Sequence, residues 1–112
     1  MISELFKSID AKDISAFTDF LNEDVIFCFA NWPQVDGKAN VTNAVNAFLQ
    51  SIAAIEHQVL ACWQPDDMVI CRGLVTYTRH DHTTLTVPFA NILQILDGEI
   101  IDYRIFADIS EL

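Results

Sequence analysis

Two asparagines stand where a strand pattern calls for apolar side chains. Asn91 shares its alternation with Phe89 and Leu93, and Asn31 ends an earlier strand on the same parity as Phe29. A buried amide without a hydrogen-bond partner costs about 1–3 kcal/mol. Each amide is therefore either paired within the protein or lines a cavity, where it meets a ligand or water. The inward parity that both share favours the cavity.

Two tyrosines and a tryptophan extend this candidate site. Tyr77 and Tyr103 have inward parity, and a buried phenol normally keeps its hydroxyl hydrogen-bonded. Such a hydroxyl can donate to a carbonyl or enolate oxygen of a ligand, although plain core packing is the alternative. Trp32 follows the first strand, where it either closes the mouth of a pocket or anchors a surface loop.

The histidines offer one candidate base and no metal site. His57 begins a strand with inward parity, and imidazole exchanges protons near neutral pH; an exposed strand end is the alternative. His80 and His82 flank Asp81 in a hairpin tip, which lacks the further ligand and the fixed geometry of a zinc site. We therefore expect neither a metal nor a cofactor.

The cysteines, Cys28, Cys62 and Cys71, lie within apolar runs and have no CxxC spacing. Their odd number predicts buried free thiols in a reducing compartment, so we expect a cytoplasmic protein. Residues 1–13 lack the basic start of a secretory signal. No apolar run approaches the roughly 18–20 residues that cross a bilayer.

Composition indicates one compact domain over residues 1–112. Hydrophobic residues make up 52% of the chain and charged residues 20%, which excludes intrinsic disorder. The formal charge of −10 would repel polyanions, so we expect no nucleic acid and no membrane surface as partner.

The periodicity predicts helices before strands, in the order ααβαββββ of an α+β fold. The expected helices cover residues 5–9, 14–21 and 37–55, and the expected strands cover 25–31, 57–64, 68–79, 83–96 and 100–109. The strand faces that point away from the helices remain apolar, with Ile70, Leu74, Ala90, Ile92 and Phe106 among them. An exposed apolar patch of this kind predicts a homodimer through the outer sheet face.

Several segments together resemble the SnoaL-like branch of the nuclear transport factor 2-like (NTF2-like) superfamily. They are the N-terminal helices, the strand into Asn31-Trp32-Pro33, Gly37-Lys38 at a helix start, and the run from Asp97-Gly98 to Tyr103-Arg104-Ile105-Phe106. The resemblance implies a cystatin-like cone, in which a bent sheet wraps round the helices and encloses an apolar pocket. The superfamily includes ketosteroid isomerases, epoxide hydrolases, polyketide cyclases and non-catalytic association domains, so the fold alone does not decide the activity.

The acid–base groups of the characterised family enzymes are not matched in this chain. The carboxylate of the last strand falls on Ile105, and the arginine and aspartate of the middle strand fall on Gly73 and Val75. The water-holding tyrosine becomes Phe29, and the isomerase base position offers only Asn31. No inward carboxylate is therefore expected, and enzyme activity stays open.

We expect a domain that binds a hydrophobic small molecule through neutral polar groups. The expected ligand-binding residues are Phe29, Asn31, Trp32, Val75, Tyr77, Phe89, Asn91, Tyr103 and Ile105. One alternative is an isomerase or cyclase of a hydrophobic carbonyl compound, with His57 and Tyr103 as candidate catalytic residues. The other is a non-catalytic dimerisation or interaction module. An interior cavity of about 300 Å³ or more would favour ligand binding, and a solid interior would favour the module.

Overall fold

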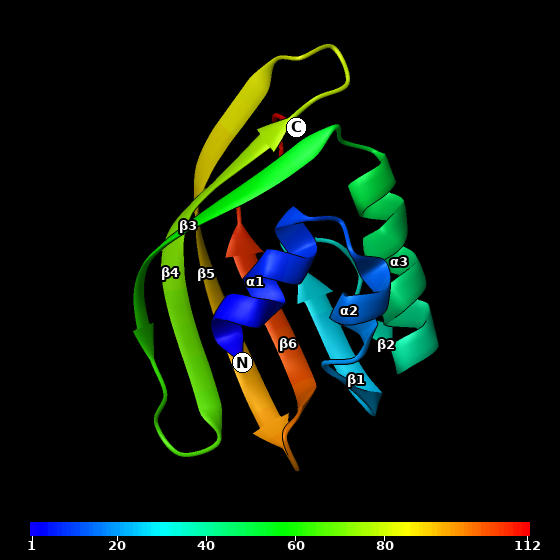
Figure 1. The fold of residues 1–112 in the computed structure, drawn as a ribbon, viewed down its shortest axis with the longest axis vertical. Coiled ribbons are helices and arrows are strands. Elements are labelled where there is room, and N and C mark those ends of the chain that lie inside the picture. Colours follow the sequence, from blue (N-terminus) through cyan, green and yellow to red (C-terminus); the bar gives the residue numbers. More distant parts are fainter.

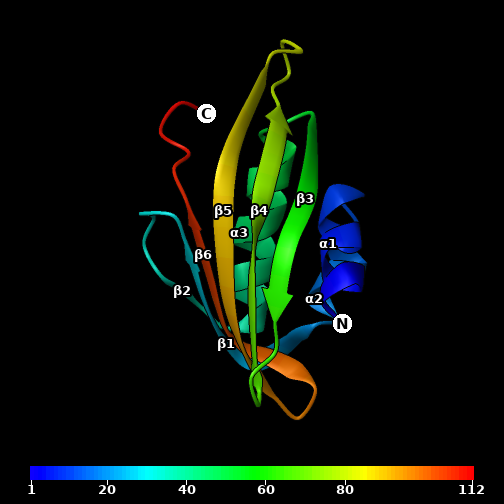
Figure 2. The same ribbon diagram turned by 90° about the vertical axis from the view of Figure 1, so that its left-hand side faces the viewer.

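The computed structural model describes residues 1–112 as one curved, six-stranded sheet with the helices in its concavity (Figures 1 and 2). The helices are α1 (Ile2–Asp10), α2 (Ile14–Thr18) and α3 (Lys38–Gln50). The strands are β1 (Leu21–Phe29), β2 (Val35–Asp36), β3 (Ala54–Trp63), β4 (Met68–Thr78), β5 (Thr84–Leu96) and β6 (Glu99–Ala107). The sheet order is β2-β1-β6-β5-β4-β3, and β1 and β6 are the only parallel neighbours. The predicted α+β fold is confirmed.

Two predicted helices are shorter than their apolar periodicity suggested. Helix α2 ends at Thr18, and Leu21 instead begins β1 opposite Ile100 of β6. Helix α3 ends at Gln50, and Ile55 belongs to β3, opposite Tyr77. In both places an apolar residue suits the core from either element, so the periodicity runs past the true boundary. The short strand β2 was not predicted, because two residues carry no alternation.

The inner face of the sheet forms the core with the helices. Tyr103, 1% exposed, lies opposite Phe27 of β1 on one side and Leu93 of β5 on the other. A register shift between Gln94 and Ile95 changes the parity beyond that point. The alternation through Tyr103 predicts Ile101 on the buried face, and this is wrong: Ile100 is fully buried and Ile101 only half-buried.

The prediction of three buried free thiols is wrong. Cys62 and Cys71 lie opposite each other on β3 and β4 and form a disulfide, with their Cα atoms 4.2 Å apart. A bulge between Val59 and Ala61 shifts the register and brings the two side chains to the same face. Cys28 alone is free. The cysteines therefore give no support to a reducing compartment.

None of the helices is both long and apolar enough to cross a membrane.

Candidate functional site

A cavity lies between the inner face of the sheet and the three helices. Its volume is about 80 Å³, and 16 of the 19 residues that line it are hydrophobic. That volume exceeds the roughly 10–15 Å³ that holds one water molecule, and it is smaller than the about 300 Å³ typical of sites for drug-sized ligands. The interior is therefore hollow, but it admits only a small molecule or the inner end of a larger one.

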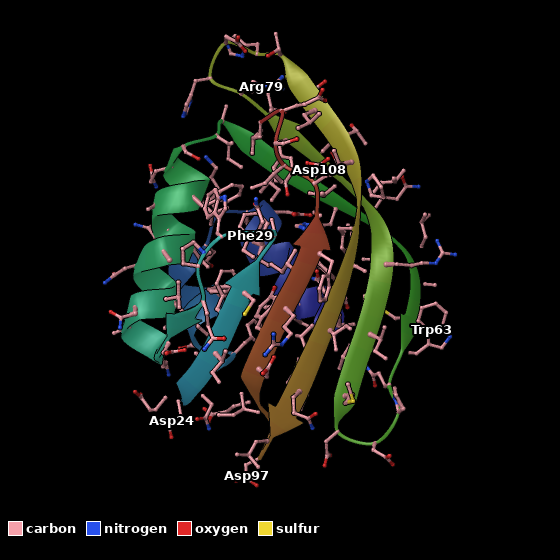
Figure 3. The ribbon with its side chains drawn as sticks, turned by 180° about the vertical axis from the view of Figure 1, so that it is seen from behind. Asp24, Phe29, Trp63, Arg79, Asp97 and Asp108 are labelled. Atoms are coloured by element: carbon pink, nitrogen blue, oxygen red, sulfur yellow. A yellow bond between two sulfur atoms is a disulfide. The ribbon has the colours of Figure 1, made fainter.

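Aromatic rings form the wall at the more exposed end of the cavity. Trp32 is 49% exposed and contacts Phe29 edge-on at a ring-centroid distance of 5.2 Å. The ring centroid of Phe48 in α3 lies 4.9 Å from that of Phe29 and 5.8 Å from that of Tyr77. Phe29 stands at the end of β1, as Figure 3 shows, so the chain leaves the sheet just before Trp32. Trp32 thus occupies the mouth of the pocket, one of the two positions expected for it.

Asn91 is the buried polar side chain of the cavity wall. It is 2% exposed on β5, between Cys71 of β4 and Ile105 of β6 in the sheet register. No protein group donates a hydrogen bond to its Oδ1. Most buried amide oxygens in proteins have a partner. This one has none among the side chains that surround it, although it lines a space that a ligand can enter.

Both tyrosines line the cavity with protonated hydroxyls. Burial raises the pKa of Tyr77 to about 12. Burial also raises the pKa of Tyr103, which is almost fully enclosed. Desolvation disfavours the phenolate, so each hydroxyl remains an O–H donor near neutral pH. The two tyrosines can therefore donate hydrogen bonds to an acceptor such as a carbonyl oxygen.

His57 lines the cavity, and the carboxylate of Asp10, which is not a lining residue and which the sequence did not reveal, contacts it. Its Nδ1 lies 2.6 Å from Oδ1 of Asp10, at the end of α1, and its backbone N–H donates to Oδ2 of Asp10 at 3.0 Å. The imidazole packs between Phe6 of α1 and Phe89 of β5, at ring-centroid distances of 4.6 Å and 5.2 Å. The carboxylate of Asp10 therefore acts on the pocket only through His57, and none of the lining residues carries a carboxylate.

Most of the predicted site residues gather round this one cavity, and Asn31 does not. The predicted residues that line it are Phe29, Trp32, His57, Val75, Tyr77, Phe89, Asn91, Tyr103 and Ile105. Asn31 is exposed and lies in a shallow depression beside Phe106 and Asp108. Its inward parity was extrapolated from β1, but that strand ends at Phe29, and Ala30 has a φ of 53°, which turns the chain. The prediction of two amides on one inner face is therefore wrong for Asn31.

Asp10 gave no site signal in the sequence. It ends a helix 47 residues before His57, and an acidic residue at that place looks like part of the cap of the next helix. Only the packing of α1 against β3 brings the two together. The apolar residues Phe6 and Ile9 show which face of α1 turns inward, and Asp10 follows directly after them.

The fold and the enclosed cavity define a class of small α+β domains with a curved sheet round a pocket. Residues 2–103 match the family model of the SnoaL-like domain. The chain therefore belongs to the SnoaL-like family, and its fold is that of NTF2-like proteins.

Solved structures with this fold cover nearly the whole chain. An NTF2-like protein of unknown function from Burkholderia pseudomallei has a TM-score of 0.88 at 14% identity, over 98% of this chain and 89% of its own. TerC, co-crystallised with polyporic acid, has a TM-score of 0.86 at 15% identity, over 98% and 90% of the two chains. An LEH-like epoxide hydrolase from M. tuberculosis has a TM-score of 0.84 at 11% identity, over 97% of this chain and 80% of its own. No curated protein matches the sequence. Identities this low establish the fold and not the activity.

Proposed function

We propose that this domain binds a small hydrophobic molecule that carries both a hydroxyl group and a carbonyl group. The apolar wall supports the hydrophobic part of the ligand, since 16 of the 19 lining residues are hydrophobic. The ligand-bound structure of TerC supports the use of this fold for small molecules. A cavity of about 80 Å³ limits the enclosed part of the ligand to a small group.

The observation that carries the proposal is the unpaired Oδ1 of Asn91. Because this oxygen is buried and no protein group donates to it, a ligand hydroxyl that donates to it would replace a missing hydrogen bond rather than compete with an existing one. The hydroxyls of Tyr77 and Tyr103 each carry a hydrogen, so each needs a hydrogen-bond acceptor on the ligand. A carbonyl on the same ligand would satisfy one of them.

A matched pair of ligands tests the role of Asn91. para-Hydroxyacetophenone carries both groups, and acetophenone lacks the hydroxyl; NMR titration of the protein measures both dissociation constants. We expect the hydroxylated ketone to bind about fivefold more tightly, because one net hydrogen bond contributes about 1 kcal/mol. In Asn91→Leu that preference should disappear. Gln94→Leu, on the same strand but exposed, is the control and should keep it. Equal preference in the wild type and Asn91→Leu would contradict the proposal.

The outer face of the sheet supports a second part of the proposal, a homodimer. Ile70 pairs with Ile92 and Ala90 pairs with Phe106 across neighbouring strands, and Phe106 is 53% exposed. At the edge of the same face Trp63 lies opposite Ile70 and projects from the sheet (Figure 3). This contiguous apolar surface suits a self-complementary contact with a second copy.

Charge on the outer face also favours self-association. The chain has only six basic residues against sixteen acidic ones. Two of the six, Arg72 and Arg104, alternate onto the outer face, where Arg104 pairs with Asp102 at 2.9 Å. The centre of this face therefore lacks the excess of negative charge that would drive two copies apart.

A further inference from the structure

The disulfide lies beside the unpaired oxygen of the cavity wall. In the sheet register Cys71 of β4 is opposite Cys62 of β3 on one side and opposite Asn91 of β5 on the other. Residues directly opposite each other in an antiparallel pair point to the same face, with their Cβ atoms about 4.5–5.5 Å apart. Cys71 is 0% exposed and Asn91 is 2% exposed, so both side chains lie on the buried inner face. The sulfur of Cys71 is therefore a close neighbour of the Asn91 amide.

The bonding state of Cys71 decides whether this neighbour can donate a hydrogen bond. In the disulfide the sulfur carries no hydrogen, and Oδ1 of Asn91 has no donor. A reduced cysteine carries an S–H group, which is a weak donor. Because Oδ1 of Asn91 is a buried acceptor without a partner, the thiol hydrogen of a reduced Cys71 would satisfy it.

A reductant can reach the other half of the disulfide. Cys62 is exposed on β3, the strand at the edge of the sheet, whereas Cys71 is buried. Access helps to decide which sulfur of a disulfide a thiolate attacks. A dithiol therefore attacks the sulfur of Cys62, and the sulfur of Cys71 leaves and takes up a proton. The second thiol of the reagent then releases Cys62 from the mixed disulfide, so the dithiol closes to its own disulfide while the protein gains two electrons and two protons.

We propose that this disulfide is a redox switch of the ligand pocket, in which reduction lets the Cys71 thiol occupy the acceptor that Asn91 otherwise offers to a ligand hydroxyl. In the oxidised protein the ligand hydroxyl supplies a missing hydrogen bond. In the reduced protein it meets an oxygen that already has a donor, and the cost of an unpaired buried acceptor is gone. Reduction should therefore weaken the binding of hydroxylated ligands and leave the binding of ligands without a hydroxyl unchanged. The inference rests on the proposed function, because it is a regulation of the same site.

The third cysteine lies apart from this switch and serves as a control. Cys28 is on β1, opposite Arg104 of β6, and β1 is separated from β4 by two strands of the sheet. Its thiol donates to Oε1 of Gln34 at 3.7 Å and is free whether or not the disulfide is reduced. Cys28→Ser should therefore keep the redox response of the wild type.

The test titrates the two acetophenones into oxidised protein and into protein reduced with dithiothreitol. We expect the oxidised protein to bind para-hydroxyacetophenone about fivefold more tightly than acetophenone, and the reduced protein to show a preference below about twofold. The affinity for acetophenone should be the same in both states. The amide NMR spectrum of each sample checks that the reduced protein remains folded.

Two single variants separate the thiol from the loss of the cross-link. Cys62→Ala removes the disulfide and leaves the thiol of Cys71, whereas Cys71→Ala removes both. With both variants kept in dithiothreitol, the hydroxyl preference should be lost in Cys62→Ala and stay at about fivefold in Cys71→Ala. A third measurement needs no ligand: the infrared S–H stretching band of the reduced wild type should shift in Asn91→Leu, because leucine removes the acceptor.

The outcomes distinguish failure of the switch from failure of the binding site. A full hydroxyl preference in the reduced wild type or in Cys62→Ala overturns the switch and leaves the binding proposal intact. A loss of preference in Cys71→Ala also overturns the switch, because the loss would then follow from the missing cross-link. An S–H band that is identical in the reduced wild type and reduced Asn91→Leu overturns the hydrogen bond to Asn91. An oxidised wild type without any hydroxyl preference contradicts the binding proposal itself, and the switch with it.

Discussion

Replacement of Asn91 by leucine distinguishes a ligand-binding amide from a structural one, because the two roles predict opposite changes in stability. An amide that holds the sheet together would leave partners unsatisfied when it is removed, and the protein would lose stability. Asn91 is instead 2% exposed, and its Oδ1 has no protein donor. Leucine is of similar size and makes no demand for hydrogen bonds. The substitution should therefore stabilise the fold.

The expected gain follows from the desolvation of the amide. A buried acceptor without a protein partner costs about 1–3 kcal/mol, and leucine removes that cost. The free energy of unfolding should rise by about 1–3 kcal/mol in Asn91→Leu. A domain of this size gains about 4 °C in Tm for each kcal/mol, so the Tm should rise by about 4–12 °C.

Urea denaturation followed by tryptophan fluorescence measures this change, and the midpoint should rise with an unchanged slope. Gln94→Leu is the control, because its side chain is exposed and loses only one surface hydrogen bond, from Nε2 to the carbonyl oxygen of Asp67, so stability should change by less than about 1 kcal/mol. A loss of about 1 kcal/mol or more in Asn91→Leu would refute the argument, since it would show that Asn91 is satisfied in the folded protein. A gain in stability together with a loss of hydroxyl preference would be the signature of a site that trades stability for binding.

Three further predictions concern the disulfide, the tyrosines and the outer face. The disulfide joins Cys62 and Cys71, which are nine positions apart in the sequence. Its reduction should lower the free energy of unfolding by about 2–3 kcal/mol, and equal urea midpoints with and without a dithiol would contradict this. The chain has only two tyrosines, so phenolate absorbance reads Tyr77 and Tyr103 alone, and it should stay low through the usual range near pH 10. Above pH 10 the tyrosines of the unfolded chain release protons that the native state keeps. The free energy of unfolding should therefore fall as the pH rises toward the pKa of Tyr77 at about 12. Phenolate formation near pH 10 in the folded protein would refute this prediction. Ile92→Asp should convert a dimer to a 12.6 kDa monomer in sedimentation velocity, and a wild type that is already monomeric at tens of micromolar would refute the dimer.

The sequence was sufficient for the architecture because long strands repeat their signal many times. The alternation through Phe89, Asn91 and Leu93 identified the inward face of β5, and Asp97-Gly98 identified the last hairpin. The pair adopts positive φ angles of 52° and 79°, as a tight hairpin turn requires. Each such feature depends on neighbours in the chain, so it can be predicted without knowing which strands pair.

The wrong predictions concern places where a single residue changes the register or the direction of a strand. A bulge in β3 brings Cys62 opposite Cys71, and the positive φ of Ala30 turns Asn31 out of the pocket. Neither position has a sequence signature strong enough to mark it, because any residue can take up a bulge and alanine rarely adopts a positive φ. A single such event reverses the face of every residue beyond it.

The Asp10–His57 pair shows why the missing family carboxylates do not settle the chemistry of this pocket. The family pattern places acid–base groups on the strands, and there the chain has Gly73, Val75 and Ile105. The carboxylate comes instead from the end of α1 and reaches the pocket only through a histidine on the edge strand β3. The same contact packs α1 against β3, since Phe6 lies against the ring of His57. The orientation of His57 in the cavity wall thus depends on the packing of α1 against β3, so a change that loosens this contact should alter the pocket even where every residue of its strand wall is kept.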